Sequence, residues 1–286
     1  MASSGEAAAV SARLGDRVMR DSTRAWFDRV AQDAGDPFLL DGYGRVAEAG
    51  GEALLRRMVA DLKGKLAPLA GTTVLEVGCG AGAITKGLVV DAKSVTAVDF
   101  SHPMLLQARR SGLSEPGYVT ADALLLPFRG GSFDRVVCYS VFNNFPSLDF
   151  AAQVVRELAR VAKPGGRVLI GQVPNADRKE AWFRDYSARF GGAPPSRARA
   201  LLGACKHRVL RGARAVLSLM GKQPAPAVAF TYYRAEFFHR VAAELRHTCD
   251  IMPAFNLLQD GNGPASADYR LDVCITVTSL PTPAET

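Results

Sequence analysis

A buried strand that runs into a glycine-rich turn, residues 74–82 (VLEVGCGAG), limits the possible folds of this chain more than any other stretch. The apolar residues predict the strand, and a helix is expected to follow at about 84–90. Three glycines at alternate positions let the backbone bend sharply and lie against a ligand, where a Cβ would clash. Open α/β sheets bind nucleotides at turns of this kind, at the carboxyl ends of parallel strands. The stretch therefore predicts a nucleotide-like ligand held by the backbone.

The spacing of these glycines argues against one class of nucleotide-binding protein. Dinucleotide-binding folds have glycine at the first, third and sixth positions of the turn, whereas here the glycines stand at the first, third and fifth. Glu76, two residues before the first glycine, also argues against a nicotinamide-dependent oxidoreductase. A second signal is the apolar stretch 94–99, which ends in Asp99 at the position where a ribose diol is held. Together the two stretches predict a ligand that contains a ribose.

From about residue 72 to residue 173 the chain resembles the class I S-adenosylmethionine-dependent methyltransferases. Five motifs carry the resemblance, in the order and at the spacing that the family has. They are the glycine turn, Asp99-Phe100-Ser101 with Met104-Leu105, Ala121-Asp122-Ala123 with Pro127-Phe128, residues 132–137 and residues 156–166. The number of motifs and their order make the resemblance specific.

The resemblance implies an α/β fold, a doubly wound and mostly parallel seven-stranded sheet of the Rossmann-like methyltransferase type. It divides the chain into an N-terminal helical lid (1–68), a cofactor-binding core (69–175), a basic helical insertion after strand five (176–229) and a segment that completes the sheet (230–286). Strands are expected near 72–77, 94–99, 117–121, 135–139, 167–173, 248–254 and 270–278, the last one antiparallel as in the family. Helices are expected near 13–34, 46–62, 84–90, 103–111, 149–162, 177–190, 196–220 and 233–247.

Residues 1–12 are expected to be disordered. The two helices that follow could pack on the sheet or, as in many members of the family, close over the cofactor. Trp26, Phe27 and Tyr43 suit such a lid, although core packing is the better prediction for any single one of them. Near the end of the core, Gly165 and Gly166 are expected to break the helix before strand five.

The cofactor of the family is S-adenosylmethionine, which leaves as S-adenosylhomocysteine, and the resemblance assigns its contacts residue by residue. Backbone groups around Gly78 would hold the methionine end, and Glu76 would hold the turn and reach the ammonium group. Asp99 would accept the ribose hydroxyls, and Asp122 would accept the adenine amino group. The full set of expected cofactor-binding residues is Glu76, Gly78, Cys79, Gly80, Asp99, Phe100, Met104, Asp122, Ala123 and Tyr139.

No catalytic residue can be assigned from the sequence. The sulfonium already activates the methyl group, so catalysis is mainly in-line placement of the acceptor, and a base is needed only if the acceptor must first lose a proton. The candidates are Tyr43, Asn143, Tyr233 and His239, of which Tyr233 is expected at the start of the helix 233–247. Asn143 stands where family members often carry histidine, and an amide cannot act as a base.

The positive charge of the chain is concentrated in one segment. The formal net charge is +7, and residues 176–222 contain 11 Lys or Arg against 3 Asp or Glu, so this segment supplies the whole excess. It could be a solvated helix packed on the sheet edge, could contact an anionic membrane surface, or could steer an acidic or carrier-bound acceptor. Nothing in the sequence resembles a nucleic-acid-binding module, so no nucleic-acid partner is expected.

Residue spacing also argues against metals, disulfides and export. No His, Asp or Glu cluster has metal-ligand spacing, so no metal is expected. Five cysteines without a Cys-x-x-Cys pair argue against a disulfide framework. The N-terminus has neither a basic start nor a long apolar run, so neither a signal peptide nor a membrane span is expected, and a cytoplasmic location follows. The oligomeric state stays open.

These observations predict methyl transfer from S-adenosylmethionine to oxygen or nitrogen of a small-molecule acceptor, in secondary metabolism or saccharide tailoring. The alternative is a relative on the same fold that binds the cofactor without methylating, such as a cyclase or a decarboxylase.

Overall fold

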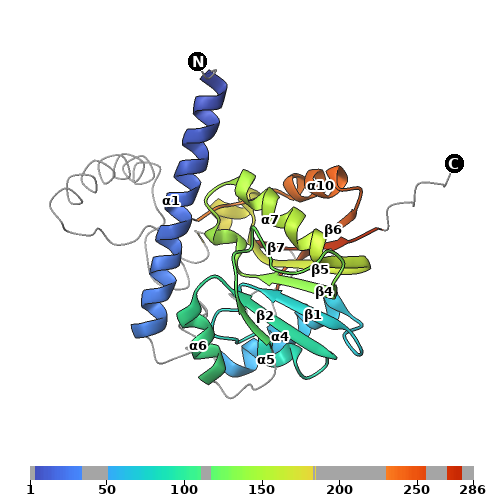
Figure 1. Ribbon diagram of the computed structural model, residues 1–286. Helices are drawn as coiled ribbons and strands as arrows, with labels where there is room; N and C mark the ends of the chain where they lie inside the picture. Colours follow the sequence, from blue (N-terminus) through green and yellow to red (C-terminus); the bar gives the residue numbers. More distant parts are fainter. Residues whose placement is uncertain are drawn as a thin grey trace.

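The computed structural model describes residues 4–33, 51–110, 117–182, 184, 230–255 and 269–278 (Figure 1). Its strands are β1 (Thr73–Val77), β2 (Ser94–Asp99), β3 (Gly117–Thr120), β4 (Phe133–Tyr139), β5 (Ala162–Pro174), β6 (Thr248–Pro253) and β7 (Arg270–Thr276). They form a seven-stranded sheet in the order β3-β2-β1-β4-β5-β7-β6. Strands β1 to β5 pair in parallel, and β7 runs antiparallel to β5 and β6. The doubly wound, mostly parallel fold predicted from the sequence is confirmed.

The strand order reverses between β1 and β4. The chain first builds outward from β1 through β2 to β3, and then returns to pair β4 with the other side of β1. The connections that leave β1 and β4 therefore run away from each other, and a crevice forms between them at the carboxyl edge of the sheet. Open α/β sheets bind their ligands in this crevice, and here the glycine turn lies at it.

Helices cover both faces of the sheet (Figure 1). Helices α4 (Gly51–Leu66), α5 (Thr85–Leu88) and α6 (His102–Arg110) lie on one face, and α7 (Leu148–Val161) and α10 (Ala235–Glu244) lie on the other. Alternate side chains of β1 serve the two faces, because Leu75 and Val77 pack with α7 and α10 whereas Val74 packs with α4. At the start of α7, Ser147 Oγ accepts the Phe150 N–H at 3.1 Å and caps the helix.

Two boundaries differ from the sequence-based predictions for physical reasons. Helix α7 ends at Val161, before the two glycines that were expected to break it, because a proline at 164 disfavours a helical conformation at the preceding residue. Both glycines lie inside β5, which begins at Ala162. Helix α10 begins at Ala235 and not at Tyr233, because Tyr233 forms a bridge with Asn175 and donates its N–H to the Pro174 carbonyl at 2.9 Å.

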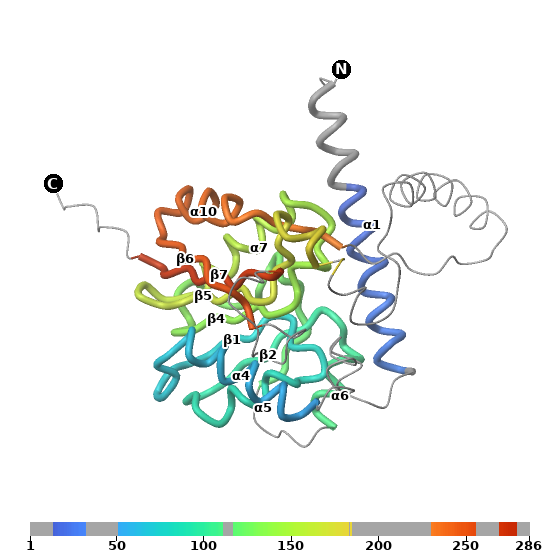
Figure 2. The backbone as a smooth tube through the Cα atoms, turned by 180° about the vertical axis from the view of Figure 1, so that it is seen from behind, coloured from blue at the N-terminus to red at the C-terminus, as the bar shows by residue number. Residues whose placement is uncertain are grey.

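Helix α1 (Ser4–Asp33) runs along one side of the sheet domain, next to α6 (Figures 1 and 2). The expectation that residues 1–12 are disordered is wrong from Ser4 onward, since these residues are helical. Four alanines among residues 6–12 explain the difference, because alanine has the highest helix propensity. Near the other end of α1, Ala31 packs against Ala81 and Met104, which docks the helix on α6 and on the glycine turn.

Several predicted elements lie outside the described residues. They include most of the basic insertion, of which the structure describes η2 (Ala176–Arg178) and a few residues after it, and the candidate residue Tyr43 also lies outside. The second predicted helix, 46–62, corresponds to α4, which continues one turn further to Leu66.

A buried ion pair joins α4 to the sheet. Lys65 Nζ lies 2.7 Å from Asp272 Oδ2 and 2.6 Å from Asp61 Oδ2, and it donates to the Pro253 carbonyl at 2.8 Å. The Asp272 side chain has no exposed surface, and its other oxygen accepts the Gln172 N–H at 2.8 Å. Burial raises the pKa of Asp272 to about 6, against the opposing effect of the Lys65 ammonium. The pair thereby supports an irregular part of β5, where Gln172 has a φ of 56°.

Candidate functional site

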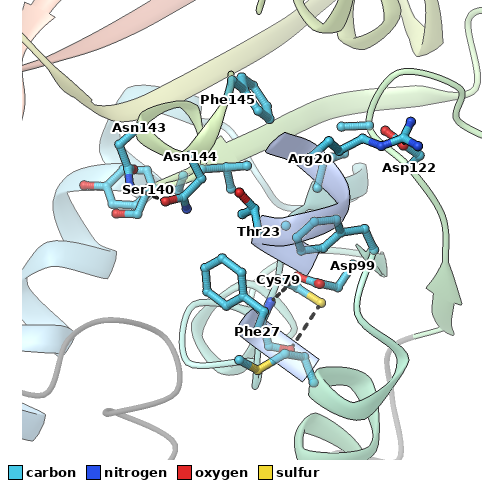
Figure 3. A pocket seen from close by; sticks show the side chains of 18 of the residues that line it. Arg20, Thr23, Phe27, Cys79, Asp99, Asp122, Ser140, Asn143, Asn144 and Phe145 are labelled. Atoms are coloured by element: carbon cyan, nitrogen blue, oxygen red, sulfur yellow. Dashed lines mark hydrogen bonds and ion pairs between the residues drawn. The ribbon is translucent and has the colours of Figure 1, made fainter. Parts of the chain in front are cut away.

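A cavity of about 510 Å³ lies at the carboxyl ends of β1, β2, β4 and β5, with α1 forming one wall (Figure 3). All the residues expected to contact the cofactor line this cavity: Glu76, Gly78, Cys79, Gly80, Asp99, Phe100, Met104, Asp122, Ala123 and Tyr139. Most of them lie at the ends of β1, β2, β3 and β4 or in the loops that follow, and Met104 lies in α6. The parallel sheet brings these strand ends to one edge.

The glycine turn wraps around the end of β1. The N–H groups of Gly78 and Cys79 both donate to the Val98 carbonyl, at 2.7 and 3.0 Å, which fixes the turn against β2. Gly78, Gly80 and Gly82 have positive φ angles of 79°, 56° and 88°. A Cβ on Gly78 would also lie 2.3 Å from Val141 Cγ2, so this position requires glycine for both its backbone angle and its space.

We expect Gly78→Ala to lower the free energy of unfolding by about 1–3 kcal/mol, because the alanine combines a strained φ with a steric overlap. Urea unfolding measures this difference. The matched control is Gly64→Ala, because Gly64 lies within α4 and a Cβ there meets nothing within 4 Å. That control is expected to stabilise the protein by about 0.5–1 kcal/mol. Equal stability of Gly78→Ala and wild type would contradict the steric argument.

Asp99 is a buried carboxylate at the end of β2, with 6% of its surface exposed. Its Oδ2 accepts the Gly80 N–H and its Oδ1 accepts the Ser101 N–H, each at 2.9 Å. Burial raises the pKa of Asp99 to about 6, and the two N–H groups oppose the rise. The carboxylate is therefore held rigidly at the cavity wall by the turn on one side and by its own loop on the other.

Glu76 is buried in β1, the strand next to β2 in the sheet, with 2% of its surface exposed. The Thr85 hydroxyl, at the first residue of α5, donates to Glu76 Oε2 at 2.6 Å. This bond joins the end of β1 to the helix that follows the turn.

Asp122 and Phe100 form the far end of the cavity, and both contact α1. Asp122 Oδ1 accepts the Leu124 N–H at 2.9 Å, and Asp122 Oδ2 lies 3.1 Å from Arg20 Nη1 (Figure 3). The ring of Phe100 lies 5.9 Å from that of Phe27.

Sequence reasoning missed part of the wall that α1 contributes. Arg20, Thr23, Trp26 and Phe27 of α1 line the cavity, and only the two aromatic residues had been considered for a lid. Arg20, Thr23 and Phe27 recur at helical spacing on one face. The signal in the sequence was that the polar residues Arg20 and Thr23 lie on the same helix face as Phe27. That pattern could have predicted that this face lines a ligand site.

Besides the pairing of Arg20 with Asp122, three polar contacts hold α1 in this position. Ser147 Oγ donates to Asp16 Oδ2 at 2.6 Å, Ser101 Oγ donates to Asp28 Oδ1 at 2.5 Å, and Gln107 Nε2 donates to the Ala31 carbonyl at 2.7 Å. The first contact lies at the start of α7 and the other two lie at α6, so α1 is fixed at both ends of its path across the cavity.

The opposite half of the cavity is lined by amides, aromatic rings and a guanidinium. Its residues are Asn143, Asn144, Phe145, Pro146, Phe150, Gln172, Phe230 and Arg270. Asn143 Nδ2 donates to Asn144 Oδ1 at 2.9 Å. Arg270 Nη1 donates to the Gln172 carbonyl at 2.7 Å, and this bond joins the start of β7 to the end of β5. Gln172, Phe230 and Arg270 were not predicted.

The structure does not support a catalytic role for two of the candidates. Tyr233 is 1% exposed, and its hydroxyl donates to the Phe142 carbonyl at 2.8 Å within a cluster of aromatic rings. His239 is exposed on α10, and neither residue lines the cavity. Asn143 does line it, whereas Tyr43 lies outside the described residues.

Among the described residues, no group of three or more His, Cys, Asp or Glu side chains could hold a metal ion. No helix in that part of the chain is both long and apolar enough to span a bilayer.

Part of the chain is similar in sequence to known methyltransferases. Residues 75–170 match the family model of a methyltransferase domain. The malonyl-[acyl-carrier protein] O-methyltransferase of Erwinia pyrifoliae is 33% identical over 166 residues, which cover 56% of this chain and 62% of that protein. Methyltransferase GfsG of Streptomyces halstedii is 35% identical over 144 residues, 48% of each chain. This chain thus spans between 48% and 62% of the length of these two relatives.

A solved methyltransferase structure shares the fold of this chain. Phosphoethanolamine N-methyltransferase 1 of Haemonchus contortus, in complex with phosphoethanolamine and S-adenosylhomocysteine, matches with a TM-score of 0.61 at 14% identity. The match covers 95% of this chain and 51% of that one. Residues 75–170 of this chain thus match a methyltransferase domain, and the chain shares its fold with a solved methyltransferase.

Proposed function

We propose that this protein transfers the methyl group of S-adenosylmethionine to oxygen or nitrogen of a small-molecule acceptor and releases S-adenosylhomocysteine. The observation that carries the proposal is the meeting of the glycine turn and the buried carboxylate of Asp99 in one cavity. The turn offers backbone groups where a side chain at Gly78 would clash, and Asp99 offers oxygens at the wall. A carboxylate suits the hydroxyls of a ribose, and the backbone groups of the turn suit the polar end of the same ligand.

S-adenosylmethionine would supply an activated methyl group, which leaves placement as the main task of the chain. Asp99 would hold the ribose, Asp122 the adenine amino group, and the backbone of Gly78 to Gly80 the methionine end. Glu76 would take the ammonium group. Fixing the cofactor in this way and presenting the acceptor from the opposite half of the cavity would supply the in-line geometry, which is worth up to about 7–11 kcal/mol in well-oriented reactions.

We propose an acidic or carrier-bound acceptor. Arg270 lines the half of the cavity that the cofactor residues do not occupy, and guanidinium groups favour carboxylates and phosphates. The charge of the basic segment 176–222 would add long-range attraction. The relative from Erwinia pyrifoliae is by its name an O-methyltransferase of a malonyl group on a carrier protein.

We further propose that the reaction belongs to secondary metabolism or saccharide tailoring and takes place in the cytoplasm. The described cysteines form no disulfide, and they would stay reduced in that compartment.

Two measurements test the proposed function. Calorimetric titration with S-adenosylhomocysteine is expected to give a micromolar Kd, about −8 kcal/mol. Incubation with methyl-labelled S-adenosylmethionine and a panel of acidic, carrier-bound and neutral acceptors should then label an acceptor. Tight binding with no label transferred to any acceptor would favour a relative that uses the cofactor without methylating. No binding would overturn the proposal.

Metal chelation gives a further prediction. We expect the activity to persist in EDTA and not to rise with added magnesium, because the proposed reaction depends on placement and not on a metal-activated nucleophile. The assay is the labelled-methyl transfer with and without chelator. Activity that EDTA removes and magnesium restores would contradict this prediction and would point to ligands beyond the described residues.

A further inference from the structure

Thr23 of α1 has a hydroxyl group that the protein itself does not satisfy. The residue is 2% exposed, and among the described residues its Oγ1 has no hydrogen-bond partner. A buried hydroxyl without a partner costs about 1–3 kcal/mol, so native proteins rarely retain one. Thr23 also lines the large cavity. A ligand in that cavity is therefore the natural partner of this hydroxyl.

The position of Thr23 on α1 is well defined. One turn before it, Arg20 contacts Asp122, and one turn after it, Phe27 contacts Phe100. Figure 3 shows the Thr23 side chain directed from α1 toward the loop that carries Asn144, above the glycine turn. Because this side chain is directed toward Asn144 and away from Asp99 and Asp122, it faces the part of the cavity expected to hold the methionine end.

The charges of the cavity wall determine how a methionine end would be oriented there. That end carries an ammonium and a carboxylate on the same carbon atom. Glu76 and Asp99 are both buried carboxyl groups at the sheet side of the cavity. They attract the ammonium and repel a carboxylate. The carboxylate of the ligand is therefore expected to face away from the sheet, toward α1. There Arg20 is already paired with Asp122, whereas the Thr23 hydroxyl has no partner among the described residues.

We propose that the Thr23 hydroxyl donates a hydrogen bond to the methionine carboxylate of the bound cofactor, which makes α1 a binding element and not only a cover. The inference rests on the proposed function, because it assumes that the cavity takes S-adenosylmethionine and S-adenosylhomocysteine. It explains why a polar residue occupies a buried position on the inner face of α1, where an apolar one would stabilise the empty protein.

The test compares two ligands that differ in the proposed contact. S-adenosylhomocysteine carries the methionine-derived carboxylate, and 5′-methylthioadenosine has the same nucleoside and sulfur without the amino-acid end. Thr23→Val removes the hydroxyl and keeps the shape of the side chain. We expect it to raise the calorimetric Kd for S-adenosylhomocysteine about 10- to 150-fold, the range for a hydrogen bond to a charged group. The Kd for 5′-methylthioadenosine should not change.

Thermal unfolding of the ligand-free protein gives an independent readout. Removing an unsatisfied hydroxyl should raise the Tm by about 2–4 °C for each kcal/mol of relief. The matched control is Thr72→Val, because the Thr72 hydroxyl donates to the Leu69 carbonyl at 2.6 Å, away from the cavity. That control should lower the Tm and leave both ligand affinities unchanged. Thr23→Ser, which keeps a hydroxyl, should retain most of the affinity for S-adenosylhomocysteine.

The outcomes separate this inference from the proposed function. If wild type binds S-adenosylhomocysteine and Thr23→Val binds it equally well, the inference is overturned and the proposed function stands. If Thr23→Val weakens both ligands to the same degree, Thr23 does not contact the carboxylate, and the inference is again overturned. If wild type binds neither ligand, the proposed function fails and the inference fails with it.

Discussion

Replacing Lys65 with methionine is expected to lower the free energy of unfolding by about 3–5 kcal/mol, the typical cost of removing one partner from a buried ion pair. Methionine keeps the apolar stem of lysine and removes the ammonium. Asp272 would then remain in the sheet without its cation, at a position with no exposed surface. Because Asp272 also accepts the Gln172 N–H, the irregular part of β5 that lines the cavity should loosen with it.

The pH dependence of the stability lost in Lys65→Met tests whether the charge of Asp272 causes the loss. The pKa of Asp272 in the folded protein is about 6, above the ordinary value of 3.8, so the folded state binds this proton more tightly than the unfolded state. The contribution of Asp272 to the stability of the wild-type protein therefore falls as the pH rises from about 4 to 6. Loss of the ammonium would raise the pKa of Asp272 further and extend the fall to higher pH. The deficit of Lys65→Met should accordingly be smaller at pH 5 than at pH 8.

Lys63→Met is the matched control, since it makes the same substitution two residues earlier in α4. Lys63 pairs with Asp91, and the two side chains are 27% and 40% exposed. An exposed pair contributes about 0–1 kcal/mol, so this control should have little effect at either pH. Urea unfolding of both variants provides the comparison. Similar losses in the two variants would show that burial of Asp272 has no special energetic consequence.

Asp99→Ala is expected to weaken binding of S-adenosylhomocysteine by roughly 1.5–3 kcal/mol, or about 10- to 150-fold in Kd. The substitution removes the proposed acceptor of the ribose hydroxyls and leaves the Gly80 and Ser101 N–H groups without the oxygens that they now contact. Calorimetry measures the change in affinity, and a thermal melt shows whether the variant is folded. Equal affinity in the variant would remove Asp99 from the binding site.

The pKa of Asp99 adds a second signature. Because that pKa is about 6, wild-type affinity should decline as the pH falls below 6, where the protonated group becomes a poorer hydrogen-bond acceptor. The Asp99→Ala variant should lack this decline. Asp91→Ala serves as the control for loss of a carboxylate, because Asp91 pairs with Lys63 in solvent, and both its affinity and its pH profile should match wild type.

The cofactor side of the cavity could be predicted because short stretches of sequence define it. A strand that ends in a carboxylate and a strand that ends in alternate glycines place their last residues at one edge whenever the strands are parallel neighbours. Here β1 and β2 pair in register from Thr73 with Ser94 to Val77 with Val98. The positions of Asp99 and Gly80 follow from this register without information from the rest of the chain.

The other walls could not be predicted because distant residues position them. Thr23 faces the cavity only because Ser101 and Ser147, 73 and 131 residues away from their partners Asp28 and Asp16, fix the rotation of α1. No local pattern encodes such contacts. Tyr233 was a catalytic candidate for a similar reason. An aromatic residue next to a helix start can line a site or fill a core, and contacts with the rings of Phe142 and Phe238 place Tyr233 in the core.

The position of β7 has a consequence for how the protein is made. β7 is the last of the seven strands along the chain, yet it lies between β5 and β6 and is the strand with which β6 pairs. While the chain is being synthesised, β5 therefore presents an open edge until residues 270–276 have emerged from the ribosome. Open edges pair readily with strands of other chains, and long-range pairings form slowly. The nascent protein is thus most exposed to aggregation just before β7 pairs with β5.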